Sequence, residues 1–171
     1  MTSIVAATVD DISVLAKIGR RSLLESHGHS APTEIMHAYV DEKFTEDAIA
    51  QELSDAANLF HIIYHNGKPA GYSKTICNQP LDQFPQQRLT KLERLYLLSE
   101  FYDLKLGHQL LQYNIDLSKQ LGEDGMWLYV WKENERAMRF YGKWGFQIVG
   151  DGWFRLTETH ANPNWQMLLK Y

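Results

Sequence analysis

The chain has 171 residues and a mass of 19.9 kDa, which suits one domain over residues 1–171 with a core that needs no disulfide or metal. Its 17 Lys and Arg against 21 Asp and Glu give a net charge of −4, without the basic surplus that is typical of nucleic-acid-binding proteins. The single cysteine, Cys77, excludes an internal disulfide and a multi-cysteine zinc site, and the longest apolar run, Met126–Trp131, is far shorter than a membrane span of about 20 residues.

The first part of the chain shows helical patterns after one short strand. The N-terminal sequence MTSIVAATVDD lacks the basic start and apolar core of a signal peptide, so we expect a cytoplasmic protein that binds neither nucleic acid nor membranes. Ile4–Thr8 is β-branched and predicts a strand. Helical apolar spacing follows from Ile12 to Ile18, at positions 35–40 and after the N-cap residue Thr45. The stretch Ser26–Thr33 (SHGHSAPT) predicts a loop.

From residue 59 the pattern changes to strands separated by turns and helices. Asn66-Gly67 predicts a tight hairpin turn, and Gly122 and Gly145 each predict the end of a helix. The predicted helices are 106–121 and 134–144, and the predicted strands are 59–64, 70–77, 92–98, 126–131, 146–149 and 165–169. Helices that alternate with strands require crossovers and some parallel pairing. We therefore expect an α/β fold with a mixed sheet of about seven strands and helices on both faces.

The segment between the strand 92–98 and the helix 106–121 is a candidate phosphate site. It runs from Ser99 to Gly107, and its glycine stands where the helix begins. Backbone N–H groups at a helix N-terminus have no intrahelical partner and bind phosphate with the help of the helix dipole. An ordinary strand-to-helix turn explains the same residues.

Two segments resemble the signatures of a known superfamily. LERLYLLSEFYDLKLGHQLL resembles the cofactor motif of the GCN5-related N-acetyltransferases (GNAT), and NERAMRFYGKWGF resembles their second signature. The sequence is most similar to bacterial spermidine/spermine N-acetyltransferases. The resemblance implies a GNAT fold and direct transfer of an acetyl group from acetyl-CoA to a small primary amine, with a polyamine as the leading acceptor. Acetylation of protein N-termini or lysines is an alternative, as is a non-catalytic module that binds CoA as a sensor.

The cofactor loop departs from the family pattern at two positions. The pattern has Arg or Gln, two residues, Gly, one residue, and Gly or Ala; here these positions hold Tyr102, Lys105 and Gly107. If Lys105 adopts the positive φ of the glycine it replaces, its backbone is strained by about 1 kcal/mol or more. Its ammonium group would then lie near the pyrophosphate and compensate.

The resemblance also implies cofactor-binding residues. The pantetheine arm would lie along the strand 92–98, and Asn134 would touch it from the far side. Backbone groups along that strand would bind the arm, namely those of Tyr96, Leu97 and Leu98. The pyrophosphate would be bound by the loop and first helical turn, namely Leu104, Lys105, Leu106, Gly107, His108 and Gln109. Lys143 is assigned to the cofactor as well.

The reaction itself needs a proton acceptor and a proton donor. An alkylamine with a pKa of about 10.4 is almost wholly protonated at neutral pH, so a carboxylate that accepts its proton makes attack feasible. Glu93 is the candidate base; a salt bridge to Arg94 or a charge at the strand edge is the alternative. A thiol with a pKa of about 8.5 leaves more easily when a phenol protonates it. Tyr141 is the candidate acid, and core packing is the alternative.

Other polar and aromatic residues admit simpler roles. His27, His29 and His37 lack the carboxylates or cysteines of a metal site, so we expect no metal, and the resemblance places them beside the acceptor. Cys77 lies in a strand and is expected to be a buried structural thiol. Acidic residues that suit a polycation also suit a solvated helix face, namely Asp41, Glu42, Glu46 and Asp47. The aromatic residues near the C-terminus are either core or a homodimer surface, namely Trp153, Phe154 and Trp165.

Overall fold

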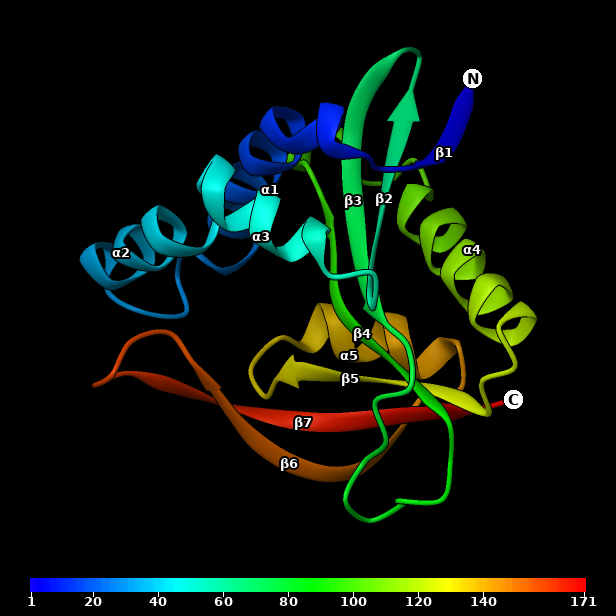
Figure 1. Ribbon diagram of the computed structural model, residues 1–171. Helices are drawn as coiled ribbons and strands as arrows, with labels where there is room; N and C mark the ends of the chain where they lie inside the picture. The colour runs from blue at the N-terminus through cyan, green and yellow to red at the C-terminus, as the bar shows by residue number, and fades with distance from the viewer. The chain divides into compact units, whose positions relative to one another are not determined.

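The computed structural model describes residues 1–171 as a mixed sheet with five α-helices (Figure 1). The strands are β1 (Thr2–Ala6), β2 (Asn58–His65), β3 (Lys68–Ile76), β4 (Leu89–Leu97), β5 (Gly125–Trp131), β6 (Gln147–Arg155) and β7 (Ala161–Lys170). The helices are α1 (Ile12–His27), α2 (Thr33–Lys43), α3 (Glu46–Ser54), α4 (Leu106–Gln120) and α5 (Glu135–Lys143), with short 3-10 helices η1 (Val9–Asp11) and η2 (Ser99–Phe101). The seven strands follow the order β1-β2-β3-β4-β5-β7-β6, with β4 and β5 parallel. The α/β fold with a seven-stranded mixed sheet is therefore confirmed.

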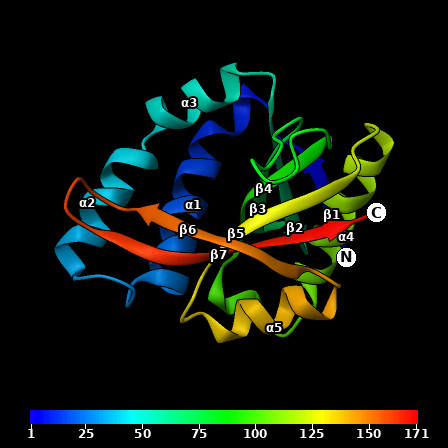
Figure 2. The same cartoon turned by 90° about the horizontal axis from the view of Figure 1, so that it is seen from below.

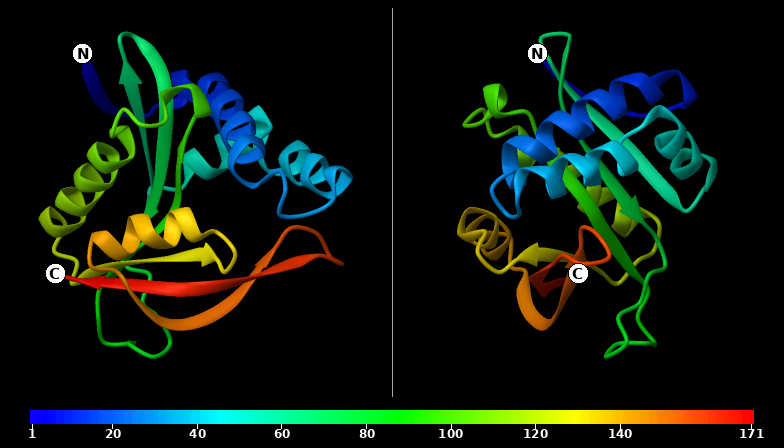
Figure 3. Two further views of the ribbon diagram at one scale, coloured as in Figure 1. Left: turned by 180° about the vertical axis from the view of Figure 1, so that it is seen from behind. Right: turned by 90° about the vertical axis from the view of Figure 1, so that its left-hand side faces the viewer.

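The chain forms two compact units, and the first contains residues 1–75 and 94–114. In this unit β1 pairs antiparallel with β2, and β2 turns into β3 through Asn66 and Gly67 (Figure 3). Both turn residues have positive φ, 50° and 76°, as a two-residue hairpin turn of this kind requires. The hairpin predicted from the Asn-Gly pair is thus confirmed.

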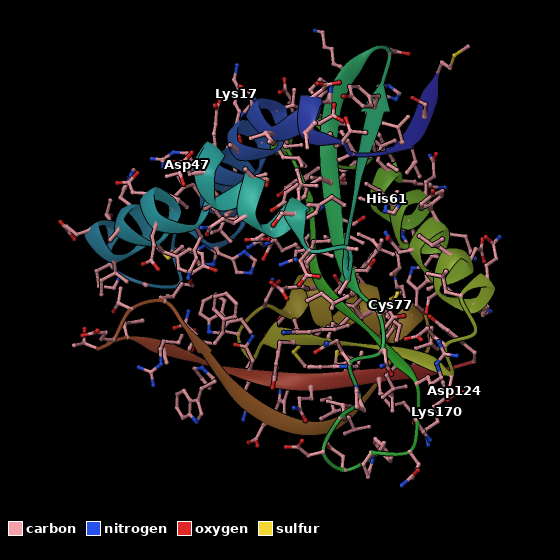
Figure 4. All side chains as sticks on the ribbon, in the orientation of Figure 1. Lys17, Asp47, His61, Cys77, Asp124 and Lys170 are labelled. Atoms are coloured by element: carbon pink, nitrogen blue, oxygen red, sulfur yellow. The ribbon has the colours of Figure 1, made fainter.

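Helix α4 packs on this first unit through buried polar and aromatic contacts. His61 of β2 is 5% exposed, and its ring meets that of Tyr113 with 4.8 Å between centroids (Figure 4). Asn114 donates to the Ser73 hydroxyl at 2.9 Å and to the Leu110 carbonyl at 2.7 Å. Because these groups are buried, the match between them fixes how α4 lies on β3.

A buried charge cluster ties α3 to β3 and β4 in the same unit. Arg94 of β4 donates two hydrogen bonds of 2.9 Å to the Glu52 carboxylate, and Lys74 of β3 lies 2.8 Å from it. The Arg94 guanidinium stacks 4.9 Å from the centre of the Phe44 ring. Two cations thus share the Glu52 carboxylate. Burial raises the pKa of the neighbouring Tyr72, which stays a neutral phenol.

The second unit contains residues 76–93 and 115–171. Here β5 pairs antiparallel with β7, and β6 and β7 run side by side as a long hairpin (Figure 2). Its core gathers Leu81, Leu89, Trp127 and Leu168. Glu123 is buried next to this core, where its carboxylate accepts from the Asn78 N–H at 2.9 Å and from the Thr90 hydroxyl at 3.2 Å.

Several boundaries differ from those predicted. Helix α1 runs to His27, so the first two residues of the predicted loop Ser26–Thr33 are helical. The strands β4, β6 and β7 are longer than predicted, because polar residues beyond the apolar runs also pair with neighbouring strands. Trp153 on β6 is 72% exposed and is not a core residue. No helix combines the length and the apolar character that crossing a bilayer requires.

Candidate active site

The segment between β4 and α4 adopts a strained conformation at the position where the sequence departs from glycine. Lys105 has a φ of 58° and Asp103 a φ of 66°. Aspartate tolerates this left-handed region better than lysine does, so Lys105 carries the larger cost, about 1 kcal/mol or more. The condition considered for Lys105, a positive φ, is therefore met. The fold keeps the backbone geometry of a glycine here and adds an ammonium group.

Helix α4 begins directly after Lys105 with unpaired backbone donors. The first intrahelical bond runs from the Gln109 N–H to the Lys105 carbonyl at 3.3 Å. The N–H groups of Leu106 and Gly107 therefore precede the helical ladder, at the positive end of the helix dipole. The Leu106 side chain is 1% exposed and anchors this turn, whereas that of Leu104 is 45% exposed. Such a turn can bind an anion.

Helix α1 holds the start of this segment in place. The Glu25 carboxylate accepts from the Ser99 N–H at 2.7 Å, and Arg21 donates to Glu100 at 2.9 Å and to Glu25 at 2.7 Å. Burial raises the pKa of Glu25, but the bonds from Ser99 and Arg21 outweigh it, so the pKa of Glu25 lies below its ordinary value. The Arg21–Glu25 spacing of four residues was the only sequence signal for this link.

At the end of β4, some backbone groups already have hydrogen-bond partners within the protein. The Leu98 N–H donates to the Ala70 carbonyl at 2.9 Å, and the Leu98 carbonyl accepts from the Phe101 N–H at 2.9 Å. Both backbone groups of Leu98 therefore have partners within the protein. Tyr96 contacts two rings of the same unit, His27 at 5.6 Å and Tyr72 at 6.1 Å between centroids.

The candidate base Glu93 lies beside a lysine rather than beside Arg94. The Glu93 carboxylate is 3.7 Å from the Lys91 ammonium, which also lies over the Trp127 ring at 5.3 Å. Arg94 pairs with Glu52. The salt bridge between Glu93 and Arg94, predicted as an alternative role for Glu93, is therefore wrong. The Glu93 side chain is 27% exposed, as a group that meets a substrate must be.

Helix α5 positions Tyr141 through caps that the sequence predicted. The side-chain oxygen Oδ1 of Asn134 accepts from the Ala137 N–H at 3.1 Å, which starts the helix, and Gly145 ends it with a φ of 94°. The half-buried Tyr141 ring packs edge-on against Phe146, with centroids 5.5 Å apart. Because the side-chain oxygen of Asn134 caps the helix, its amide nitrogen is the side-chain group that remains for a ligand. Lys143 is exposed in the last turn.

The other residues considered from the sequence are the acidic residues of α2, the histidines and Cys77. Asp41 pairs with Arg20 at 2.6 Å, and Glu42 with Lys43 at 3.1 Å. No three His, Cys, Asp or Glu side chains gather as metal ligands would. Cys77, which follows β3, is half-exposed rather than buried (Figure 4), and burial raises the pKa of its thiol.

Comparisons with known proteins identify the family and the fold of this chain. The family model of the GNAT acetyltransferases matches residues 21–146. An uncharacterized N-acetyltransferase of Lactobacillus delbrueckii subsp. lactis is 25% identical over 142 residues, which are 83% of this chain and 82% of that protein. A spermidine N(1)-acetyltransferase of Thermoplasma acidophilum is 24% identical over 147 residues, which are 82% and 85% of the two chains. The structure of the PaiA N-acetyltransferase of Thermoplasma acidophilum in complex with coenzyme A superimposes with a TM-score of 0.78 at 22% identity, over 100% of this chain and 99% of that one.

Proposed function

This chain belongs to the GNAT acetyltransferase family and is an N-acetyltransferase, and from this premise we propose that it transfers the acetyl group of acetyl-CoA to a small primary amine, with a polyamine as the leading acceptor. The proposal that the chain binds acetyl-CoA rests on the left-handed backbone of Lys105 at the start of α4. The likeness to a spermidine acetyltransferase supports the choice of acceptor. We propose further that residues 1–171 act as one domain, because β4 contributes residues to both units.

In this proposal the α4 turn binds the pyrophosphate. The N–H groups of Leu106 and Gly107 lie at the positive end of the helix dipole, and the Lys105 ammonium adds a full charge. The arm of the cofactor bonds the backbone of β4 at Tyr96 and Leu97, because Leu98 has its partners already. Asn134 contributes its amide nitrogen, and Lys143 adds charge at the end of α5.

In the proposed reaction one side chain accepts a proton and another donates one. Glu93 accepts a proton from the alkylammonium, directly or through water, and the neutral nitrogen then attacks the thioester carbonyl. The new C–N bond forms as the C–S bond breaks, and the electron pair of that bond leaves on sulfur. Tyr141 donates its phenol proton to the departing thiolate, and the second proton of the attacking nitrogen, directly or through water, restores the phenol. This order of events requires the amine and acetyl-CoA to be bound together.

A panel of acceptors tests the proposed function. Thiol release from acetyl-CoA would be measured with spermidine, spermine, putrescine, monoamines, lysine-containing peptides and free peptide N-termini. We expect the polyamines to give the highest kcat/KM. Higher kcat/KM with peptides would favour protein acetylation instead. Tight CoA binding without turnover of any amine would contradict an enzyme and favour a sensor.

We expect Gly107→Val to weaken CoA binding far more than His108→Ala does. A branched side chain at position 107 would crowd the phosphates where the backbone approaches them, whereas the exposed side chain of residue 108 has no assigned phosphate contact. Isothermal titration with CoA measures both affinities, and thermal melting verifies that both variants are folded. Equal affinity in wild type and Gly107→Val would refute the assignment of the phosphate turn.

The charge of Lys105 predicts a difference in salt dependence. Attraction between an ammonium group and phosphates is screened by salt, so the affinity of the wild type for CoA falls more steeply with ionic strength than that of Lys105→Gly. Glycine also adopts the positive φ at position 105 without strain. Titrations from low to high salt give the two slopes. Parallel slopes would mean that the ammonium group points away from the cofactor.

A further inference from the structure

The phosphate turn, residues 103–107, is strained in its middle and buried at its flanks. Asp103 and Lys105 have φ values of 66° and 58°, and both residues are exposed. Phe101 before them is 9% exposed, and Leu106 after them is 1% exposed. Residues other than glycine stay in the left-handed region only where the surrounding structure imposes it. The shape of the turn therefore depends on how its two ends are fixed.

The end of the turn that faces β4 is fixed on α1 by one carboxylate. The Glu25 carboxylate accepts from the Ser99 N–H, the first of η2, at 2.7 Å, and the Ser99 side chain also bonds it. The Ser99 carbonyl in turn accepts from the Tyr102 N–H at 3.1 Å, one residue before the turn. Hydrogen bonds to an ionised acceptor are roughly twice as strong as neutral ones. Glu25 therefore binds the short helix that leads directly into the turn.

Arg21 holds the Glu25 carboxylate in this position. Its Nε donates to Glu25 at 2.7 Å from one helical turn earlier, and its second nitrogen donates to Glu100 of η2 at 2.9 Å. Burial raises the pKa of Glu25, but the bonds from Ser99 and Arg21 hold it below its ordinary value, so the group is a carboxylate at neutral pH. The carboxylate is thus oriented by a guanidinium on its own helix and by a backbone N–H of the loop.

We propose that Glu25 is a positioning residue for the cofactor, which fixes the phosphate turn through Ser99 in the geometry that binds pyrophosphate. This role rests on the proposed function. Glu25 acts through the backbone of η2 and not through a contact with the cofactor. Without its carboxylate the strained turn relaxes, and only a fraction of the molecules keeps the N–H groups of Leu106 and Gly107 in the binding geometry. The apparent Kd for the cofactor then rises by the inverse of that fraction.

Isothermal titration with CoA, together with melting curves, tests this role. We expect Glu25→Ala to raise the Kd for CoA about tenfold, as when roughly one molecule in ten keeps the binding geometry. Arg20→Ala is the matched control and should leave the Kd within about twofold of wild type. Arg20 also lies on α1 and forms a salt bridge of 2.6 Å, but with Asp41 of α2 and not with η2. Equal Kd values for the wild type and Glu25→Ala would overturn the role.

A thioester without phosphates distinguishes positioning from general damage to the fold. Acetyl-pantetheine carries the acetyl group and the arm but no pyrophosphate, so it makes no use of the phosphate turn. With one and the same amine, Glu25→Ala should lower kcat/KM about tenfold for acetyl-CoA and leave kcat/KM for acetyl-pantetheine unchanged. An equal loss with both thioesters would mean that the variant disturbs the site as a whole, and it would overturn the positioning role.

Ser99→Pro breaks the same link from the loop side and serves as the test if Glu25→Ala does not fold. Proline suits the first position of a helix, and Leu98 before it has the extended backbone that precedes proline, with φ of −69° and ψ of 140°. We expect a loss of CoA affinity similar to that of Glu25→Ala. The double variant should bind CoA no more weakly than either single variant, because both changes remove one interaction. Additive losses would overturn the link through Ser99.

The titrations also separate this role from the proposed function. If the wild type binds CoA but acetylates no amine, the proposed reaction fails, and the Kd values of Glu25→Ala and Ser99→Pro still decide the role of Glu25. If the wild type acetylates amines and both variants bind CoA as tightly as it does, only the role of Glu25 fails. A wild type that binds no CoA would overturn both.

Discussion

Tyr141→Phe is expected to lower kcat by about 100- to 10,000-fold with little change in the KM for acetyl-CoA. The phenol is proposed to protonate the departing sulfur, an interaction made mainly in the transition state, and such a loss raises the barrier by roughly 3–5 kcal/mol. Phenylalanine keeps the ring that packs edge-on against Phe146, so the melting temperature should hardly move. Steady-state kinetics with the preferred amine, together with a melting curve, measure both quantities.

Leaving-group dependence distinguishes a lost acid from a disturbed site. A thioester with a more acidic leaving thiol needs less protonation, so it should recover the rate of Tyr141→Phe more than that of the wild type. Tyr64→Phe, which changes a half-buried tyrosine of β2 with no assigned role, is the matched control. If Tyr141→Phe keeps more than about half of the wild-type kcat while chemistry limits the rate, the phenol only packs.

Glu52→Ala is expected to destabilise the fold by about 3–5 kcal/mol, towards the lower end because the carboxylate keeps some contact with water. The Glu52 side chain is 21% exposed, whereas those of Lys74 and Arg94 are only 6% and 9% exposed. Without the carboxylate, two buried cations lose the counter-ion that they share. Urea denaturation, which yields the free energy of unfolding, measures the loss.

The control for this change is Glu42→Ala. The Glu42 side chain is 70% exposed and pairs only with its neighbour Lys43, so its removal should cost less than about 0.5 kcal/mol. A double variant, Glu52→Leu with Arg94→Met, should recover part of the stability lost in Glu52→Ala, because one cation is removed together with the carboxylate. Equal stability of Glu52→Ala and wild type would show that the cluster is solvated and contributes nothing.

Features that depend on a few adjacent residues were predicted correctly from the sequence. The Asn66-Gly67 turn, the N-cap Asn134 and the helix ends at Gly122 and Gly145 all lie where the pattern placed them. Each follows from local chemistry, because glycine and asparagine reach positive φ easily and an asparagine oxygen binds the N–H three residues on. Lys105 also has a positive φ, but the sequence raised this only as a condition, because a lysine does not reach that region easily.

The sequence by itself therefore determined the family, the mixed sheet and the local geometry of the Asn66-Gly67 turn and of α5. Tertiary structure alone decided the partners of charged and titratable groups. Arg94 pairs with a glutamate 42 positions away rather than with its neighbour Glu93, and His27 ends a helix against Tyr96 instead of standing in a loop. Apolar periodicity specifies which face of an element is buried, but the element that covers this face is set by packing between distant segments. The ion pairs between distant residues and the exposure of Trp153 depend on that packing, so the sequence alone could not predict them.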